Sequence, residues 1–182
     1  MTAPQTTTST WTVDTAHSIV EFAVKHMMLT TVKGRFRDFS ATLQIDEARP
    51  ENSSVTATID VASIDTNVPD RDAHLRSDDF LNAEKFPHIT FRSARVERGE
   101  GDRWKVAGDL TIRDVTNPVT LDVEFEGRIT DPWGNDRAAF SAETSISRKE
   151  FNVRWNQVLE TGGVVVGDNV KISLHIEAVR NK

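Results

Sequence analysis

The sequence predicts an all-β protein, built as one antiparallel β-barrel of eight strands. The 182-residue chain contains 19 Val, 20 Thr and 10 Ile but only 8 Leu, and β-branched side chains pack well on a pleated sheet. Apolar and polar residues alternate in eight separate segments, which is typical of strands with one face toward a core and the other toward water. Eight such strands close into a barrel, or stack as a sandwich.

The predicted strands begin near residue 20. The first covers residues 20–26, and His26 falls on its apolar side at the end of the strand. Phe36 then precedes a shift of phase, and one extra residue near Arg37–Asp38 predicts a β-bulge before the stripe at 39–45. The remaining stripes occupy residues 55–61, 89–93, 104–112, 119–127, 140–146 and 170–178.

Two stretches lack alternation. In Pro69–Lys85, Asp70 is expected to cap a short helix over Arg71–Arg76 that covers one end of the barrel. The second stretch, Val153–Gly167, is long, and loops of this length usually line a site. A surface loop without function is the alternative. We therefore expect one or two short helices in the connecting segments.

The domain is placed at residues 11–182, behind a polar, Thr-rich tail at residues 1–10 that is expected to be disordered. The tail has neither the basic start nor the apolar run of a signal peptide. No run of about 20 apolar residues occurs, so no integral membrane segment is expected. These features predict a cytoplasmic protein.

Charge and composition exclude several function classes. The net charge of −6 does not suit a nucleic-acid partner, because phosphate binding needs a basic face. The chain has no cysteine, and its five histidines do not stand at metal-ligand spacing, so no metal site is expected. No nucleophile elbow, phosphate loop or dinucleotide fingerprint occurs. We therefore expect a protein that is not an enzyme and has no cofactor.

The inward positions of the strands mix large residues with small ones such as Ala41, Ala57, Gly108 and Ala142. An eight-stranded barrel lies at the boundary between a filled interior and one that holds a single small ligand. Small inward residues favour a cavity, although large residues of the opposite wall could fill the gaps. The walls of such a cavity would carry almost no charge, so its ligand must be apolar along most of its length.

A series of motifs along the chain resembles the YceI-like family. They lie at residues 14–26, 32–36, 71–80, 86–91, 108–112, 115–119, 146–151 and 168–172, so the resemblance covers about Trp11 to Val179. It implies an extended, lipocalin-like barrel that carries isoprenoid quinones or polyprenyl phosphates in an apolar tunnel. The family has no agreed catalytic residues. This chain departs from it at Asn152, where a Gly commonly follows Phe151, and in lacking the signal peptide of many members.

We therefore expect a non-catalytic protein for binding, transport or storage of a long isoprenoid lipid, with homodimerisation through a barrel edge left open. The expected ligand-binding residues are Val20, Phe22, Val24, His26, Phe36, Ile59, Phe91, Leu110, Val123, Phe125, Phe140, Ile146, Trp155 and Leu174. The expected polar residues at the barrel mouth are Arg71, Asp72, His74, Arg76 and Arg148. One alternative is a lipid-modifying enzyme, an isomerase or hydrolase, that uses His and Arg at the mouth. Another is a module that binds protein through its outer face.

Overall fold

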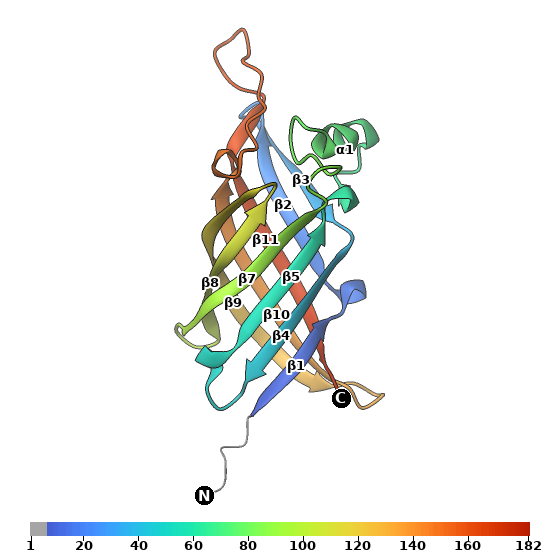
Figure 1. Cartoon of the computed structure of the whole chain (residues 1–182), viewed down its shortest axis with the longest axis vertical. Coiled ribbons are helices and arrows are strands. Elements are labelled where there is room, and N and C mark those ends of the chain that lie inside the picture. Colours follow the sequence, from blue (N-terminus) through green and yellow to red (C-terminus); the bar gives the residue numbers. More distant parts are fainter. Residues whose placement is uncertain (1–6) are drawn as a thin grey trace, which may run out of the picture.

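The computed structural model describes residues 7–182, which form an elongated, closed antiparallel barrel (Figure 1). Its strands are β1 (Thr8–Val13), β2 (Ile19–His26), β3 (Thr30–Phe36), β4 (Phe39–Asp46), β5 (Ser54–Asp60), β6 (Ile64–Asp65), β7 (His88–Arg98), β8 (Arg103–Ile112), β9 (Val115–Thr130), β10 (Asp136–Ser147) and β11 (Val166–Arg180). The helix is α1 (Pro69–Arg76), and the 3₁₀ turns are η1 (Thr15–His17), η2 (Pro50–Asn52), η3 (Val61–Ser63) and η4 (Arg148–Phe151).

Three positions of the barrel are occupied by interrupted strands. β1 and β2 pair with opposite ends of β11, with η1 between them. β3 and β4 are separated at Arg37–Asp38, and β5 and β6 by η3. When each interrupted strand counts once, the described residues form a ring of eight antiparallel positions that β11 closes by pairing with β10 on one side and with β1 and β2 on the other. This confirms the predicted fold class.

The first strand begins earlier than the sequence predicts. Thr8–Thr10 belong to β1, so the expected disorder of the tail is wrong for these residues. Residues 1–6, the rest of that tail, lie outside the described residues. Two features fix β1 in the barrel. Trp11 is only 1% exposed, and it pairs in register with Leu43 of β4. The alternation of β1 was hidden because a serine, Ser9, takes one of the buried positions.

The phase shift near Arg37–Asp38 is present, but it separates two strands and is not a bulge within one. Phe36 and Phe39 both line the interior although they are three residues apart. Register shifts occur instead at Ser93/Arg95 in β7 and at Ala139/Phe140 in β10. These irregularities bend the strands around the barrel.

The predicted helix forms, but it begins at Pro69 and the preceding residue, Val68, makes no capping hydrogen bond. Asp70 lies inside the first turn, so its predicted role as the cap is wrong. Proline suits this position because the first helical N–H would have no partner within the helix. No helix within residues 7–182 is both long enough and apolar enough to cross a membrane.

Figure 1 shows α1 and the loop before β11 at the same end of the barrel, which we call the lid end. The other end, called here the hairpin end, holds the β9–β10 turn and the start of β1. Buried apolar side chains gather in two clusters. The larger includes Ile89, Leu110 and Ile112 and reaches Phe80 and Phe151 at the lid end. The smaller, around Trp11 with Ala138 and Ala178, contains residues of β1, β10 and β11.

Candidate ligand cavity

A cavity of about 760 Å³ lies inside the barrel. Pockets that bind small molecules usually measure about 300–1,000 Å³. Its wall comes from the inward faces of the strands, so the alternation of the sequence places these residues there. Of the predicted ligand-binding residues, those that line the cavity are Val20, Phe22, Val24, Phe36, Ile59, Phe91, Leu110, Val123, Phe125, Phe140, Ile146 and Leu174.

Small inward residues act in two ways. Ala41, Ala57 and Ala142 line the cavity and leave it wide. At Gly34 and Gly108, by contrast, an added Cβ would collide with the ring of Phe22 or Phe91. There the missing side chain makes room for an aromatic ring of a neighbouring strand, so a small residue on the inner face does not always mean open space.

Arg148 fastens the long loop at the lid end. Its side chain is 5% exposed and lines the cavity. The guanidinium Nε donates to the carbonyl oxygen of Gly167 at 2.8 Å, and Nη1 donates to those of Val153 and Trp155 at 2.9 Å. Burial lowers the pKa of Arg148, while the Asp168 carboxylate, 3.7 Å away, opposes that shift. Arg148 therefore holds both ends of the loop against the barrel.

The turn that carries Arg148 ends at Asn152, whose φ of 61° lies in the left-handed region. Glycine adopts this conformation without strain, and asparagine tolerates it better than most residues. The chain therefore keeps the turn despite having Asn where the resemblance leads one to expect Gly.

Three rings pack together in the cover of the lid end. The His74 ring centroid lies 4.8 Å from that of Trp155 and 5.0 Å from that of Phe80, in edge-to-face contact. His74 Nε2 also lies 2.8 Å from an oxygen of the Asp79 carboxylate. Neither His74 nor Trp155 lines the cavity. Trp155, predicted to contact the ligand, packs instead against the cover.

The other polar residues predicted at the mouth belong to α1 and do not line the cavity. Asp72 is buried and accepts a hydrogen bond from the Thr66 backbone N–H at 2.9 Å. Arg71 donates to the Thr66 carbonyl oxygen at 2.8 Å. Arg76 is half-buried, and its carbonyl oxygen accepts from the Ala83 N–H. In this structure Arg71 and Asp72 fix the helix to the segment before it.

His26 does not line the cavity either, and its expected place near the mouth stays a prediction. His26, the last residue of β2, pairs in register with Val166, the first residue of β11. The cavity reaches Val24 and Val166 but goes no further along β2. The strand therefore extends beyond the end of the cavity.

Polar wall residues at the hairpin end were not predicted. Arg128 lines the cavity together with Gln44 and Glu47, and its guanidinium lies 5.2 Å from the Trp11 ring centroid. Arg128 donates to Asp136 and to Glu47 at 2.9 Å each, and these hydrogen bonds raise its pKa. Alternation places Arg128 on the polar side of β9, so the sequence carried no signal for this site. The register shift between β9 and β10 beside Gly127 turns Arg128 to the inner face, opposite Ala138.

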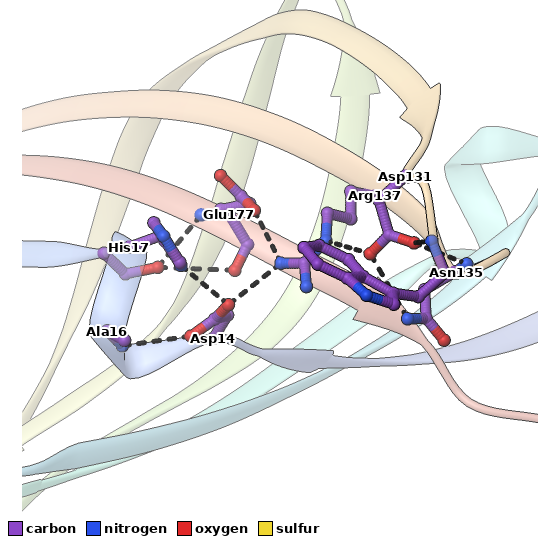
Figure 2. A network of polar contacts seen from close by, with 9 residues as sticks. Asp14, Ala16, His17, Asp131, Asn135, Arg137 and Glu177 are labelled. Carbon is purple, nitrogen blue, oxygen red and sulfur yellow. Dashed lines mark hydrogen bonds and ion pairs between the residues drawn. The ribbon is translucent and has the colours of Figure 1, made fainter.

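An ion-pair network ties the strands together at the hairpin end (Figure 2). Arg137 of β10 contacts Asp131 at 2.7 Å, Asp14 at 2.9 Å and Glu177 at 2.7 Å. The ligand atoms of Asp14, His17 and Glu177 lie within 4.8 Å of one another, close enough to hold a metal ion. The Arg137 guanidinium already supplies a positive charge to two of these carboxylates. We therefore interpret the cluster as a structural ion-pair network.

A closed antiparallel barrel around an apolar cavity defines the class of lipocalin-like barrels. The comparison with known families gives the specific assignment, because residues 11–178 match the YceI-like domain. The chain belongs to the YceI-like family, which confirms the resemblance seen in its motifs.

Relatives and solved structures agree with this assignment. The chain is 44% identical over 138 residues to the protein YceI of Escherichia coli O157:H7, covering 76% of this chain and 72% of that one. It is 30% identical to Burkholderia cenocepacia BcnA, with a TM-score of 0.80 and coverage of 91% and 98%. A polyisoprenoid binding domain from Saccharophagus degradans, implicated in plant cell wall breakdown, has a TM-score of 0.66 over 94% of this chain and 98% of that one. Its identity of 14% supports a shared fold alone.

Proposed function

We propose that this protein binds, transports or stores a long apolar isoprenoid lipid without covalent attachment. The observation that carries the proposal is the cavity of about 760 Å³ inside a barrel with apolar inner walls. The Saccharophagus domain of the same fold is described as polyisoprenoid-binding. The cytoplasmic location and the homodimer remain predictions.

The size of the cavity suits a chain of several prenyl units. A volume of about 760 Å³ lies in the upper part of the usual range of about 300–1,000 Å³ for pockets that bind small molecules. Each unit contributes on the order of 3–4 kcal/mol gross through burial of its carbons, at about 0.8 kcal/mol per CH₂. The ordering of a flexible chain offsets a large share of this gain. Apolar burial alone would still suffice for tight binding.

The charges of the wall favour an uncharged head group. Among the described residues, the cations that line the cavity are Arg128 and Arg148. Arg148 donates to backbone carbonyl oxygens, and Arg128 is paired with Glu47 and Asp136. A buried phosphate without an unpaired cation is costly. We therefore favour an isoprenoid quinone over a polyprenyl phosphate.

The alternative of a lipid-modifying enzyme expected His26, His74 or Arg148 to lie in the cavity with a perturbed titration. Of these three, Arg148 alone lines the cavity, and its guanidinium is occupied by carbonyl oxygens. Catalysis by this set of residues has no support in the geometry. The Saccharophagus domain that shares this fold is described as polyisoprenoid-binding, which supports a non-catalytic role.

A pair of variants on β5 tests the proposal. Ala57 lines the cavity, whereas the next residue, Thr58, is exposed and faces outward. Ala57→Phe is expected to reduce the prenyl lipid retained by the purified protein at least about tenfold, because the ring takes up space that the chain needs. Thr58→Phe is the matched control and should leave retention unchanged. Lipid extraction and native mass spectrometry would measure the bound lipid, and thermal unfolding would confirm that both variants fold. Equal retention by Ala57→Phe, or no prenyl lipid in any sample, would contradict the proposal.

A further inference from the structure

An apolar tip projects from the lid end of the barrel. It consists of the β2–β3 turn, Met27–Leu29, and the neighbouring turn at residues 157–165, drawn in orange at the top of Figure 1. Met28 is 69% exposed, Leu29 82% and Val158 77%. Single exposed apolar residues are common on protein surfaces, but a group of them marks an interaction site.

The two turns form one surface. The Met27 N–H donates to the carbonyl oxygen of Val165 at 2.8 Å. A methyl group placed on Gly163 would lie 3.9 Å from Met28 Sδ and 3.5 Å from a methyl carbon of Leu159. The apolar side chains of both turns therefore lie side by side, beyond the point where the cavity ends.

The β2–β3 turn has a backbone conformation that is strained for the residues it contains. Met27 and Met28 have φ of 50° and 60°, in the left-handed region. Hairpin turns with two successive residues in the left-handed region strongly prefer Asn and Gly, which adopt that conformation with little strain. The methionines gain little burial in return, since Met28 is mostly exposed. Folding alone gives no reason for long apolar side chains at these positions.

Positive charge flanks the tip although the chain as a whole has a net charge of −6. Lys25 and Lys33 stand on the two strands of the hairpin and are exposed. No acidic residue occurs between Glu21 and Asp38, and neither lysine forms an ion pair with any residue in the range 7–182. The second turn of the tip carries one exposed acidic residue, Glu160, so the positive charge comes from the hairpin alone. Exposed apolar side chains beside unpaired lysines match the two layers of an anionic membrane surface, its acyl chains and its head groups.

We infer that this tip docks onto the surface of an anionic lipid bilayer and turns the lid end of the barrel toward the membrane. Exposed apolar residues also occur at the hairpin end, where Ile129 is 66% exposed and Trp133 78%. There, however, Arg128 and Arg137 are paired with carboxylates, and the exposed apolar residues stand in the same turn region as Asp131 and Asp136. The inference goes beyond the proposed lipid binding and can be tested separately from it.

Flotation of the purified protein with vesicles provides the test. Wild-type protein is expected to bind phosphatidylcholine–phosphatidylglycerol vesicles, and to bind less at high salt or with phosphatidylcholine alone. The double variant Met28→Ser/Leu29→Ser is expected to weaken binding at least about tenfold, because it removes the inserting side chains. Lys25→Ser/Lys33→Ser should weaken it about tenfold on anionic vesicles only. The matched control, Ile129→Ser/Trp133→Ser, alters the other end and should bind like wild type.

Three results would overturn the inference. One is wild-type protein that does not float with anionic vesicles, and another is a control variant that loses binding as much as the tip variant does. The third is a dimer in analytical ultracentrifugation that the Met28→Ser/Leu29→Ser variant dissociates, which would make a second copy the partner of this surface. Bound prenyl lipid, measured by extraction, is a separate readout. A tip variant that keeps its lipid but leaves the vesicles supports docking, whereas a protein that floats but holds no prenyl lipid would contradict the proposed function alone.

Discussion

The two ends of the barrel are closed in different ways. At the lid end, irregular segments cover the cavity, and one buried arginine, Arg148, attaches the long loop through backbone carbonyl oxygens. At the hairpin end the strands themselves converge around Trp11, and Arg137 joins them through three carboxylates. Strand pairing therefore supports the hairpin end, whereas a few side chains hold the cover of the lid end.

This difference teaches which end can open. Displacement of the loop before β11 breaks the contacts of Arg148 and leaves the barrel strands paired. Opening of the hairpin end would separate β1 from β4 and β11, whose ladders close the ring. Segments with few strand hydrogen bonds open locally at lower free energy than paired strands do. We therefore expect local opening at the lid end, where the proposed membrane contact also lies.

Replacement of Arg148 should have the largest effect and should act on the lid end. Arg148→Met leaves several buried carbonyl oxygens without a partner, which costs about 3–4 kcal/mol and lowers Tm by about 10 °C. Hydrogen exchange should rise in residues 153–167. Lys149→Met, a change at the exposed neighbour, is the control and should shift stability by less than about 1 kcal/mol. Faster exchange spread equally over residues 175–180 would show that the ends are not independent.

Replacement of Arg137 should loosen the hairpin end instead. Arg137→Met leaves Asp14, Asp131 and Glu177 close together without their shared cation. We expect Tm to fall by roughly 5 °C and exchange to rise in residues 14–18 and 131–135. Arg180→Met, which removes a longer and more exposed contact to Asp136 at 3.7 Å, is the control. Unchanged exchange in both segments would contradict a role for this network in closing the barrel.

The same network predicts loss of stability in acid. The hydrogen bond from Arg137 is the main cause that holds the pKa of Asp131 well below its usual range, and His17 and then Arg137 lower the pKa of Asp14. A carboxyl whose pKa is lowered by folding stabilises the protein above its unfolded pKa of about 4, and this contribution is lost as pH falls. The difference in Tm between wild type and Arg137→Met should therefore narrow below about pH 4. A difference that stays constant down to pH 2 or widens would contradict the assignment.

The smallest loss of stability is expected when Trp155 is replaced. This variant tests whether Trp155 belongs to the cover of the lid end or to the wall of the cavity. Trp155→Leu removes ring contacts with His74 and Phe80 and should cost about 1 kcal/mol. Because Trp155 does not line the cavity, prenyl lipid retention should stay close to wild type. A tenfold loss of retention in a folded Trp155→Leu variant would instead make Trp155 part of the binding surface.

The sequence predicted the barrel wall better than the closure of its ends. Alternation along a strand assigns residues to a face, so Phe22, Phe91 and Leu174 were correctly placed on the inner wall. It does not tell where along the strand a cavity stops, and His26 lies beyond that point.

The contacts that close the ends join segments far apart in the chain. Arg137 bonds Asp14 across 123 positions and Glu177 across 40, and no local pattern encodes such pairs. The Phe22 ring lies against Gly34, and the Phe91 ring lies against Gly108. Both placements likewise depend on the register between neighbouring strands.

The most direct measurement compares two ligands of equal chain length, an isoprenoid quinone and a polyprenyl phosphate, by native mass spectrometry of the same purified protein. Both arginines of the wall, Arg128 and Arg148, already have acceptors, so burial of a phosphate would lack an unpaired cation. The quinone is expected to be retained in the cavity, and the phosphate to bind at least about tenfold more weakly. Equal or tighter retention of the phosphate would contradict the preference for an uncharged head group. Failure of both ligands to bind would contradict the assignment of the cavity as an isoprenoid site.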